Sequence, residues 1–173
     1  MNIEMLEQHK KLIVKELMLE NVPPVLYKEE AVQFLKEHVD KYKYSIPKGL
    51  QGYFCYENIP DLFKETGVVC IIKGKNPIGT IAHELCHAKQ YENHNAWLHM
   101  GPMKKALYYW GYYFYPAEIE ANSYAGKYLK SVNRKLFIRF KVSRIKVFLS
   151  TKIIMLLILG LLMAATLKII ISM

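Results

Sequence analysis

The chain has few cysteines, and their arrangement excludes two common uses of this residue. Cys55, Cys70 and Cys86 are an odd number, separated by fifteen and sixteen positions. This spacing matches neither a paired CxxC metal site nor the disulfide framework of a small secreted domain. A reducing compartment is therefore expected.

Acidic residues are absent from Ala121 to Met173, where ten Lys and Arg residues give a charge of +10. The first 120 residues carry fourteen Lys and Arg against fifteen Asp and Glu, so they are close to neutral. The formal charge of +9 for the whole chain therefore comes from its last third. Positive charge clustered in this way favours an anionic partner for that region.

The N-terminal sequence MNIEMLEQHKKLIVKEL is not expected to act as a secretory signal, because it mixes acids and bases and lacks an uninterrupted apolar stretch. Asn2 stands where N-myristoylation requires glycine. The long apolar run is at the other end, from Ile153 to Ser172, and Lys168 is its only charged residue. Twenty helical residues rising about 1.5 Å each can cross the roughly 30 Å hydrocarbon layer of a bilayer. The run predicts one transmembrane helix over residues 153–172.

Residues 131–152, directly before this run, alternate basic with apolar side chains. Clustered Lys and Arg can attract the phosphates of a nucleic acid. Their position beside a predicted span favours anionic lipid instead, with about 1 kcal/mol per basic residue near the surface. The positive-inside tendency then places residues 1–152 in the cytoplasm, anchored to a membrane by the C-terminal helix. Nothing in the sequence assigns an oligomeric state.

The first 130 residues are predicted to form an α+β domain, with helices on both sides of a small sheet. Asn76 followed by Pro77 is typical of a helix start, and Pro116 suits the first position of another helix. Apolar periodicity and breaker residues give the remaining elements. The expected helices cover residues 3–20, 28–42, 77–92 and 116–130, and the expected strands lie within 50–56 and 68–72.

The segment His83-Glu84-Leu85-Cys86-His87 has the HExxH pattern of zinc metallopeptidases. Residues four apart on a helix face the same way, so His83 and His87 can bind one ion while Glu84 lies beside it. Zinc suits imidazole ligands and an open water position, and a carboxylate can take the proton of the attacking water. The pattern therefore predicts His83 and His87 as zinc ligands and Glu84 as the general base.

A catalytic zinc site needs a third protein ligand, and the predicted helix after Pro116 offers one. Glu118, Ala121, Asn122 and Ala125 share one face of that helix. The small residues would allow a close approach to the histidine helix, so Glu118 is expected at the metal and Asn122 at a ligand histidine. Glu120 points elsewhere and is the weaker candidate.

HELCHAKQ followed some thirty residues later by PAEIEANSYA resembles the minimal gluzincin-type metallopeptidases, including the ImmA/IrrE and related phage or mobile-element domains. The resemblance covers about Ile78 to Leu129. It implies a small zincin-like domain in which the HExxH helix packs against a glutamate-bearing helix of the form ExxA(D/N)xxA. By position it implies His83, His87 and Glu118 as zinc ligands, Glu84 as base, and a protein or peptide substrate.

Several alternatives remain open at this point. Gln90 and Asn93 stand where the metzincin pattern requires glycine and histidine, which excludes that subclass. His94 and His99 are further candidates for the metal or for oxyanion stabilisation, and the aromatic residues 108–115 for a substrate groove. Cys86 is interpreted as core packing. The competing function is a non-enzymatic membrane adaptor whose zinc site is structural or vestigial.

Overall fold

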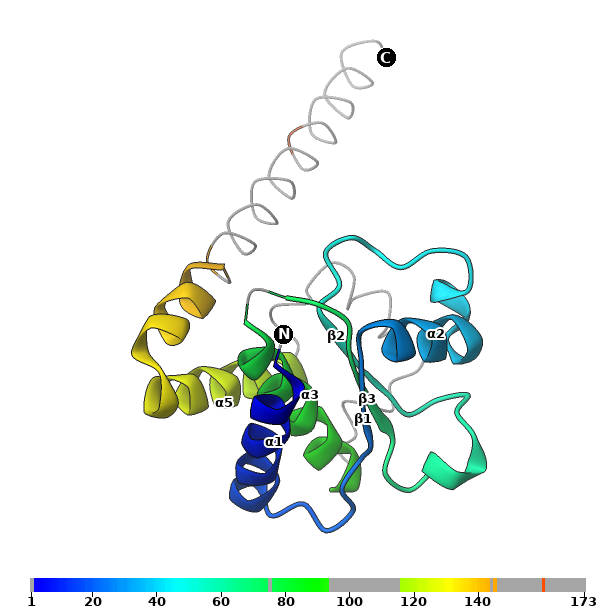
Figure 1. Cartoon of the computed structure of the whole chain (residues 1–173), viewed down its shortest axis with the longest axis horizontal. Coiled ribbons are helices and arrows are strands. Elements are labelled where there is room, and N and C mark those ends of the chain that lie inside the picture. The colour runs from blue at the N-terminus through cyan, green and yellow to red at the C-terminus, as the bar shows by residue number, and fades with distance from the viewer. Residues whose placement is uncertain (1, 75, 94–115, 144, 146–159, 161–173) are drawn as a thin grey trace, which may run out of the picture.

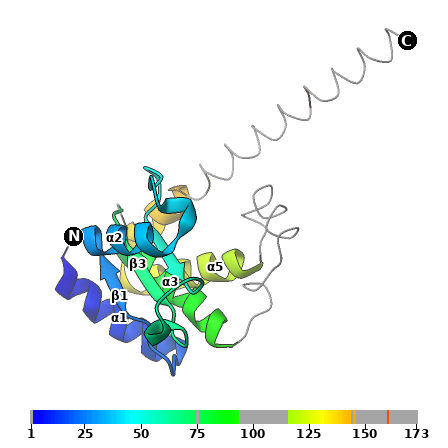
Figure 2. The same cartoon turned by 90° about the vertical axis from the view of Figure 1, so that its right-hand side faces the viewer.

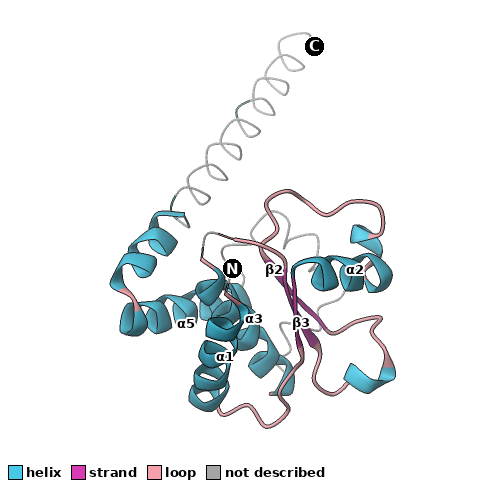
Figure 3. Cartoon of the chain, viewed as in Figure 1, coloured by secondary structure: helices cyan, strands magenta, loops and turns pink. Residues whose placement is uncertain are grey.

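The computed structural model describes residues 2–74, 76–93, 116–143, 145 and 160. Within these ranges the chain has a mixed α+β fold, as predicted, with helices arranged around a small three-stranded sheet (Figures 1 and 3). The labelled helices are α1 (Ile3–Leu17), α2 (Lys28–His38), α3 (Pro77–Glu92) and α5 (Pro116–Val132). The strands are β1 (Val25–Tyr27), β2 (Gly52–Cys55) and β3 (Val68–Ile71), and 3-10 turns occupy Asp40–Tyr42 and Asp61–Phe63.

The central strand of the sheet is β3, in the order β1-β3-β2. It runs parallel to β1 and antiparallel to β2. Its four residues are all buried, and they alternate between two cores. Val69 and Ile71 face the core formed with α1 and α3, whereas Val68 and Cys70 face the core under α2. The helices therefore lie on both sides of the sheet, as expected.

Strands β2 and β3 lie where the sequence predicts them, whereas β1 is not predicted. This strand has only three residues after the breaker Pro23-Pro24, too few for an alternating pattern to show. Its hydrogen bonds to β3 define it, and those depend on a partner more than forty residues away. The first two helices are also shorter than expected, because α1 ends at Met18 in a left-handed conformation and α2 gives way to the 3-10 turn at Asp40.

Helix α3 begins where the sequence predicts. The side chain of Asn76 caps it by accepting a hydrogen bond from the backbone N–H of Gly79, and Pro77 occupies the first turn. Its other end is held by Glu92, whose carboxylate accepts from the backbone N–H groups of Glu20 and Asn21. Both ends of the helix that carries the HExxH segment are therefore fixed by hydrogen bonds.

Helix α5 packs against α3, and the two form the most extensively packed pair among the described elements (Figure 2). Ala117, Ala121 and Ala125 of α5 are all buried, so the contact face is lined with small side chains. This is the close approach that their helical spacing predicts. It brings the first turn of α5 beside the HExxH segment.

Beyond α5, residues 134–143 form a further helix, capped by Asn133 through its side-chain oxygen and the N–H of Leu136. Leu136, Phe137 and Phe140 pack partly against the main core. The beginning of the predicted basic segment 131–152 is therefore attached to the domain by its apolar residues. The domain boundary at residue 130 stays a prediction.

None of the helices within the described ranges is long and apolar enough to cross a membrane. The predicted transmembrane helix at residues 153–172 lies outside the described residues, apart from Gly160. It therefore stays a prediction.

Candidate metal centre

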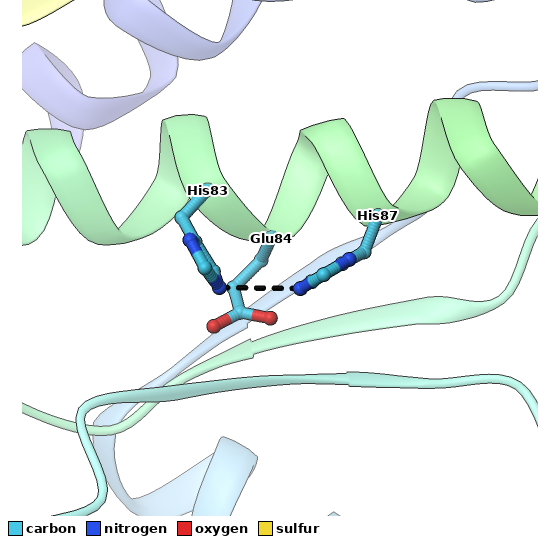
Figure 4. A group of neighbouring side chains, drawn as sticks. All are labelled: His83, Glu84 and His87. Carbon is cyan, nitrogen blue, oxygen red and sulfur yellow. Dashed lines mark hydrogen bonds between the residues drawn. The ribbon is translucent and has the colours of Figure 1, made fainter. Parts of the chain in front are cut away.

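Helix α3 brings His83, Glu84 and His87 to one place (Figure 4). The two histidines are one helical turn apart, and their Nε2 atoms lie 3.1 Å from each other. The ligand atoms of all three side chains lie within 4.8 Å of one another, and all three residues are buried. The predicted helical placement of the pattern is confirmed.

Helix α5 adds the carboxylate of Glu118, which is only 5 % exposed. Its Oε2 lies 3.3 Å from His83 Nε2, and its Oε1 lies 3.2 Å from His87 Nε2. Four ligands bound at about 2.0–2.1 Å in a tetrahedron are separated from one another by about 3.3–3.4 Å. The two imidazoles and the carboxylate are therefore spaced closely enough to act as three ligands of one ion.

The hydrogen bonding of this cluster also fits a cation. Glu118 Oε2 is buried and has no hydrogen-bond partner in the part of the chain that the structure describes, although His83 Nε2 lies near it. Burial alone would raise the pKa of Glu118, but attraction to the two imidazoles outweighs burial and holds this pKa well below its usual value. An ionised carboxylate facing two imidazole nitrogens is a donor set that suits zinc or a similar divalent metal.

Gln90 contributes to the site, although the sequence pattern does not predict this role. It is 3 % exposed, and its Nε2 donates to the backbone oxygen of Ala117 at 3.0 Å and to Glu120 Oε2 at 2.7 Å. Because both amide hydrogens are used in this way, Gln90 Oε1 is the atom that accepts from His87 Nδ1, at 2.7 Å. In the neutral form of His87 the Nε2 lone pair is then directed to the cluster.

This arrangement also gives Glu120 a role. Glu120 was the weaker ligand candidate, and it contacts Gln90 rather than the cluster of ligand atoms. Glu118 is the glutamate whose oxygens lie beside His83 and His87. The signal for Gln90 in the sequence is its position three residues after His87, on the same face of the helix. Nothing in the sequence indicates that Gln90 would pair with Glu120 on α5.

The expected hydrogen bond from Asn122 to a ligand histidine is not seen among the described residues. Asn122 Oδ1 and His83 Nδ1 are both buried there without a partner. His87, the other ligand histidine, is oriented by Gln90. The tautomer of His87 is therefore set by its own helix, whereas no described residue makes such a contact with His83 Nδ1.

Glu84 lies against the edge of the sheet. A side chain added at Gly52 of β2 would come within 3.0 Å of Glu84 Oε1 and within 2.5 Å of a methyl carbon of Thr80. Glycine at this position lets α3 and the Glu84 carboxylate approach β2 closely. The carboxylate is 7 % exposed and packs between the helix and the strand.

Of the remaining candidate site residues, only Cys86 lies in the described part of the chain. Cys86 is buried, and burial, together with the charges of Glu120 and Glu118, raises its thiol pKa to about 12. Its burial supports the interpretation of Cys86 as core packing. His94, His99 and the aromatic residues 108–115 lie outside the described residues.

Comparison of the chain with protein-family models, with curated proteins and with solved structures finds no match.

Proposed function

We propose that this protein is a zinc-dependent metallopeptidase of the HExxH type, tethered to a membrane by residues 153–172. His83, His87 and Glu118 would hold the metal, and Glu84 would act as general base. The observation that carries this proposal is the convergence of two imidazole Nε2 atoms and one carboxylate, 3.1–3.3 Å apart, beside a second buried carboxylate on the same helix.

The protein positions the three proposed ligand side chains in different ways. His83 and His87 are placed by one turn of α3, and Gln90 fixes the ring of His87. Glu118 is held by the packing of α5 on α3. A zinc ion bound there would lower the pKa of a water molecule toward neutrality and polarise a substrate carbonyl. Three protein ligands leave a fourth position open, as catalytic zinc sites require.

Glu84 supplies the proton transfers of the proposed reaction. Its carboxylate would accept a proton as water attacks the peptide carbonyl, and would return that proton to the leaving amine when the C–N bond breaks. A structural zinc site does not need a carboxylate one residue after its first ligand. The buried position of Glu84, close to both histidines, therefore supports an enzyme over an adaptor.

The test is a Glu84→Gln protein, with zinc content and hydrolysis of a mixed peptide library measured on the same preparation. Glutamine keeps the side-chain volume but cannot accept the proton, so we expect activity to fall by about 10²–10⁴-fold. The zinc content should stay at the wild-type value, because Glu84 is not one of the proposed ligands. Glu37→Gln, on the exposed side of α2, is the matched control and should change neither quantity.

The rival adaptor function predicts a different result. With or without bound zinc, wild-type protein would hydrolyse nothing in the library, and Glu84→Gln would replace it fully in cells. Comparing the proteomes of cells that carry the two forms extends the test to native substrates. If no protein fragment distinguishes them, the peptidase proposal is wrong.

A further inference from the structure

The helix at residues 134–143 has two apolar faces, and within the described part of the chain only one of them packs against the core. Leu136, Phe137 and Phe140 are half-buried and pack toward the core. The rings of Phe137 and Phe140 lie over Gly126 of α5, each within 4 Å of the position that a side chain there would occupy. Figure 1 shows this helix, coloured orange, at the periphery of the fold beyond α5.

The second face is a stripe of Ile138, Val142 and Ile145, spaced by four and three residues. Residues with this spacing share one side of a helix. They are exposed to 52 %, 46 % and 54 % respectively. We call these three residues the apolar stripe. Together they form a contiguous exposed apolar patch, the kind of surface that can mark a contact site for a protein or a membrane.

Positive charge borders the stripe on both sides. At 100° per residue, Arg134 and Lys141 fall on one flank of the stripe, and Lys135 and Arg139 fall on the other. All four side chains are exposed, and none forms a salt bridge with another described residue. An apolar face bordered by Lys and Arg is the pattern of a helix that lies in the surface of an anionic membrane.

The chain length limits how far this helix can lie from a bilayer. The apolar run begins at Ile153, eight residues after Ile145. Eight residues span at most about 26–29 Å when fully extended. If residues 153–172 cross the membrane, the stripe is held within that distance of the lipid headgroups.

A second copy of the chain is a poorer partner for the stripe, because it would present the same positive charge.

We propose that the apolar stripe of Ile138, Val142 and Ile145 docks onto anionic phospholipid, so that the helix at 134–143 lies in the membrane surface and fixes the domain against it. The proposal rests on the membrane tether in the proposed function and is independent of the peptidase activity. The stripe enters the headgroup region, and the four basic residues contact lipid phosphates. The opposite face keeps its contact with α5.

The test uses full-length protein in vesicles, with an environment-sensitive fluorophore attached to Val142→Cys. The three native cysteines are buried and their thiol pKa values are raised by burial, so the introduced exposed cysteine reacts first. We expect a blue shift and a several-fold rise in emission with phosphatidylserine vesicles, and neither with phosphatidylcholine alone. Ser123→Cys, exposed on α5, is the control and should respond to neither composition.

Charge variants sharpen the test. Each basic residue near an anionic surface changes the equilibrium constant for docking by about fivefold, so Lys135→Gln with Lys141→Gln should lower that constant by about 25-fold. Emission from residue 142 that is the same with both lipids would overturn the proposal. A blue shift that grows with the ratio of protein to lipid would also overturn it, since that would show a second copy covering the stripe.

Alkaline carbonate extraction of the same vesicles reports on the tether separately. Protein that remains in the membrane while residue 142 stays in water contradicts the docking proposal and leaves the tether intact. Protein that is extracted contradicts the tether, whatever the fluorophore reports. Neither result depends on zinc or on Glu84.

Discussion

Helices α2 and α3 pack on opposite faces of one sheet, yet α2 buries two of its residues and α3 buries eleven. The buried residues of α2 are Ala31 and Leu35, both apolar. Those of α3 include His83, Glu84, His87 and Gln90, because α1, α5 and the sheet surround this helix. Helix α2 therefore buries only apolar side chains, whereas α3 also places polar side chains in the protein interior.

The two helices also carry the same residue types in different surroundings. On α2, Gln33 donates to Glu37 at 2.9 Å, and the nearby His38 is 4.0 Å from the same glutamate. These side chains are on the water side of the helix, where such pairs contribute little to stability. On α3, His87 and Gln90 bind carboxylates of a second helix inside the protein. A buried polar cluster is costly unless its members satisfy one another.

The largest expected effect is on zinc binding, and it distinguishes His87 of α3 from His38 of α2. His87→Ala should abolish zinc binding, because only His83 and Glu118 would remain as proposed protein ligands. His38→Ala on α2 should leave zinc content unchanged. Elemental analysis of both proteins after dialysis gives the comparison. Full zinc in the His87→Ala protein would show that the metal is elsewhere or is not bound at all.

A smaller effect on zinc affinity is expected when Gln90 of α3 is replaced, with Gln33 of α2 as the control. Gln90→Ala removes the acceptor that orients His87, and loss of such an outer contact typically lowers metal affinity by about 10–100-fold. Gln33→Ala removes the equivalent amide from the exposed pair on α2 and should have no effect. Titration against a competing zinc chelator measures both. Equal affinities for the two variants would mean that Gln90 has a packing role only.

Much of α3 and α5 could be predicted from the sequence because the signals are local. The cap at Asn76, the proline at Pro77 and the four-residue spacing of the histidines each act within one helix. The small residues of α5 correctly indicated a close helix contact and placed Glu118 beside the histidines. Local patterns therefore gave both helices of the site and the atoms that face each other across it.

The parts that were missed depend on contacts between distant segments. Strand β1 is defined by its pairing with β3, and the pair of Gln90 and Glu120 joins residues thirty positions apart on two helices. Asn122 was expected at a histidine because it shares a face with Glu118, yet its side-chain oxygen finds no described partner. A shared face limits the direction of a side chain but does not select its hydrogen-bond partner.

The third effect concerns how closely α3 approaches the sheet. Gly52→Ala would place a carbon 2.5 Å from the Thr80 methyl and 3.1 Å from Glu84 Cγ, so these side chains, or the helix or strand backbone, must shift. We expect a loss of about 1–3 kcal/mol in the free energy of unfolding, as for other overpacked sites. Gly49→Ala, with no heavy atom within 4 Å, is the control. Equal thermal unfolding of the two variants in detergent would contradict the close contact.

The smallest expected effect is the pH dependence of the metal-free protein. Burial alone would lower the pKa of His87, but the hydrogen bond and charge of Glu118 raise it to about 9, above the value of 6.5 for a free side chain. A raised pKa in the folded state means that this pair stabilises the fold fully below pH 6.5 and loses that contribution as the pH rises through about 9. The stability advantage of wild type over Glu118→Gln should therefore shrink from pH 6 to pH 9, after zinc is removed with a chelator.

The exposed pair on α2 provides the control for this measurement. Glu37→Gln changes the charge beside His38 in water, where screening makes the interaction weak, so its difference from wild type should not vary over the same range. Melting temperatures of the three proteins at several pH values, each without metal, give the comparison. If the difference between wild type and Glu118→Gln is as flat as that for Glu37→Gln, His87 is not protonated in the metal-free protein. Zinc would then bind at neutral pH without displacing a proton from His87, and its affinity for the site would not rise between pH 6.5 and 9.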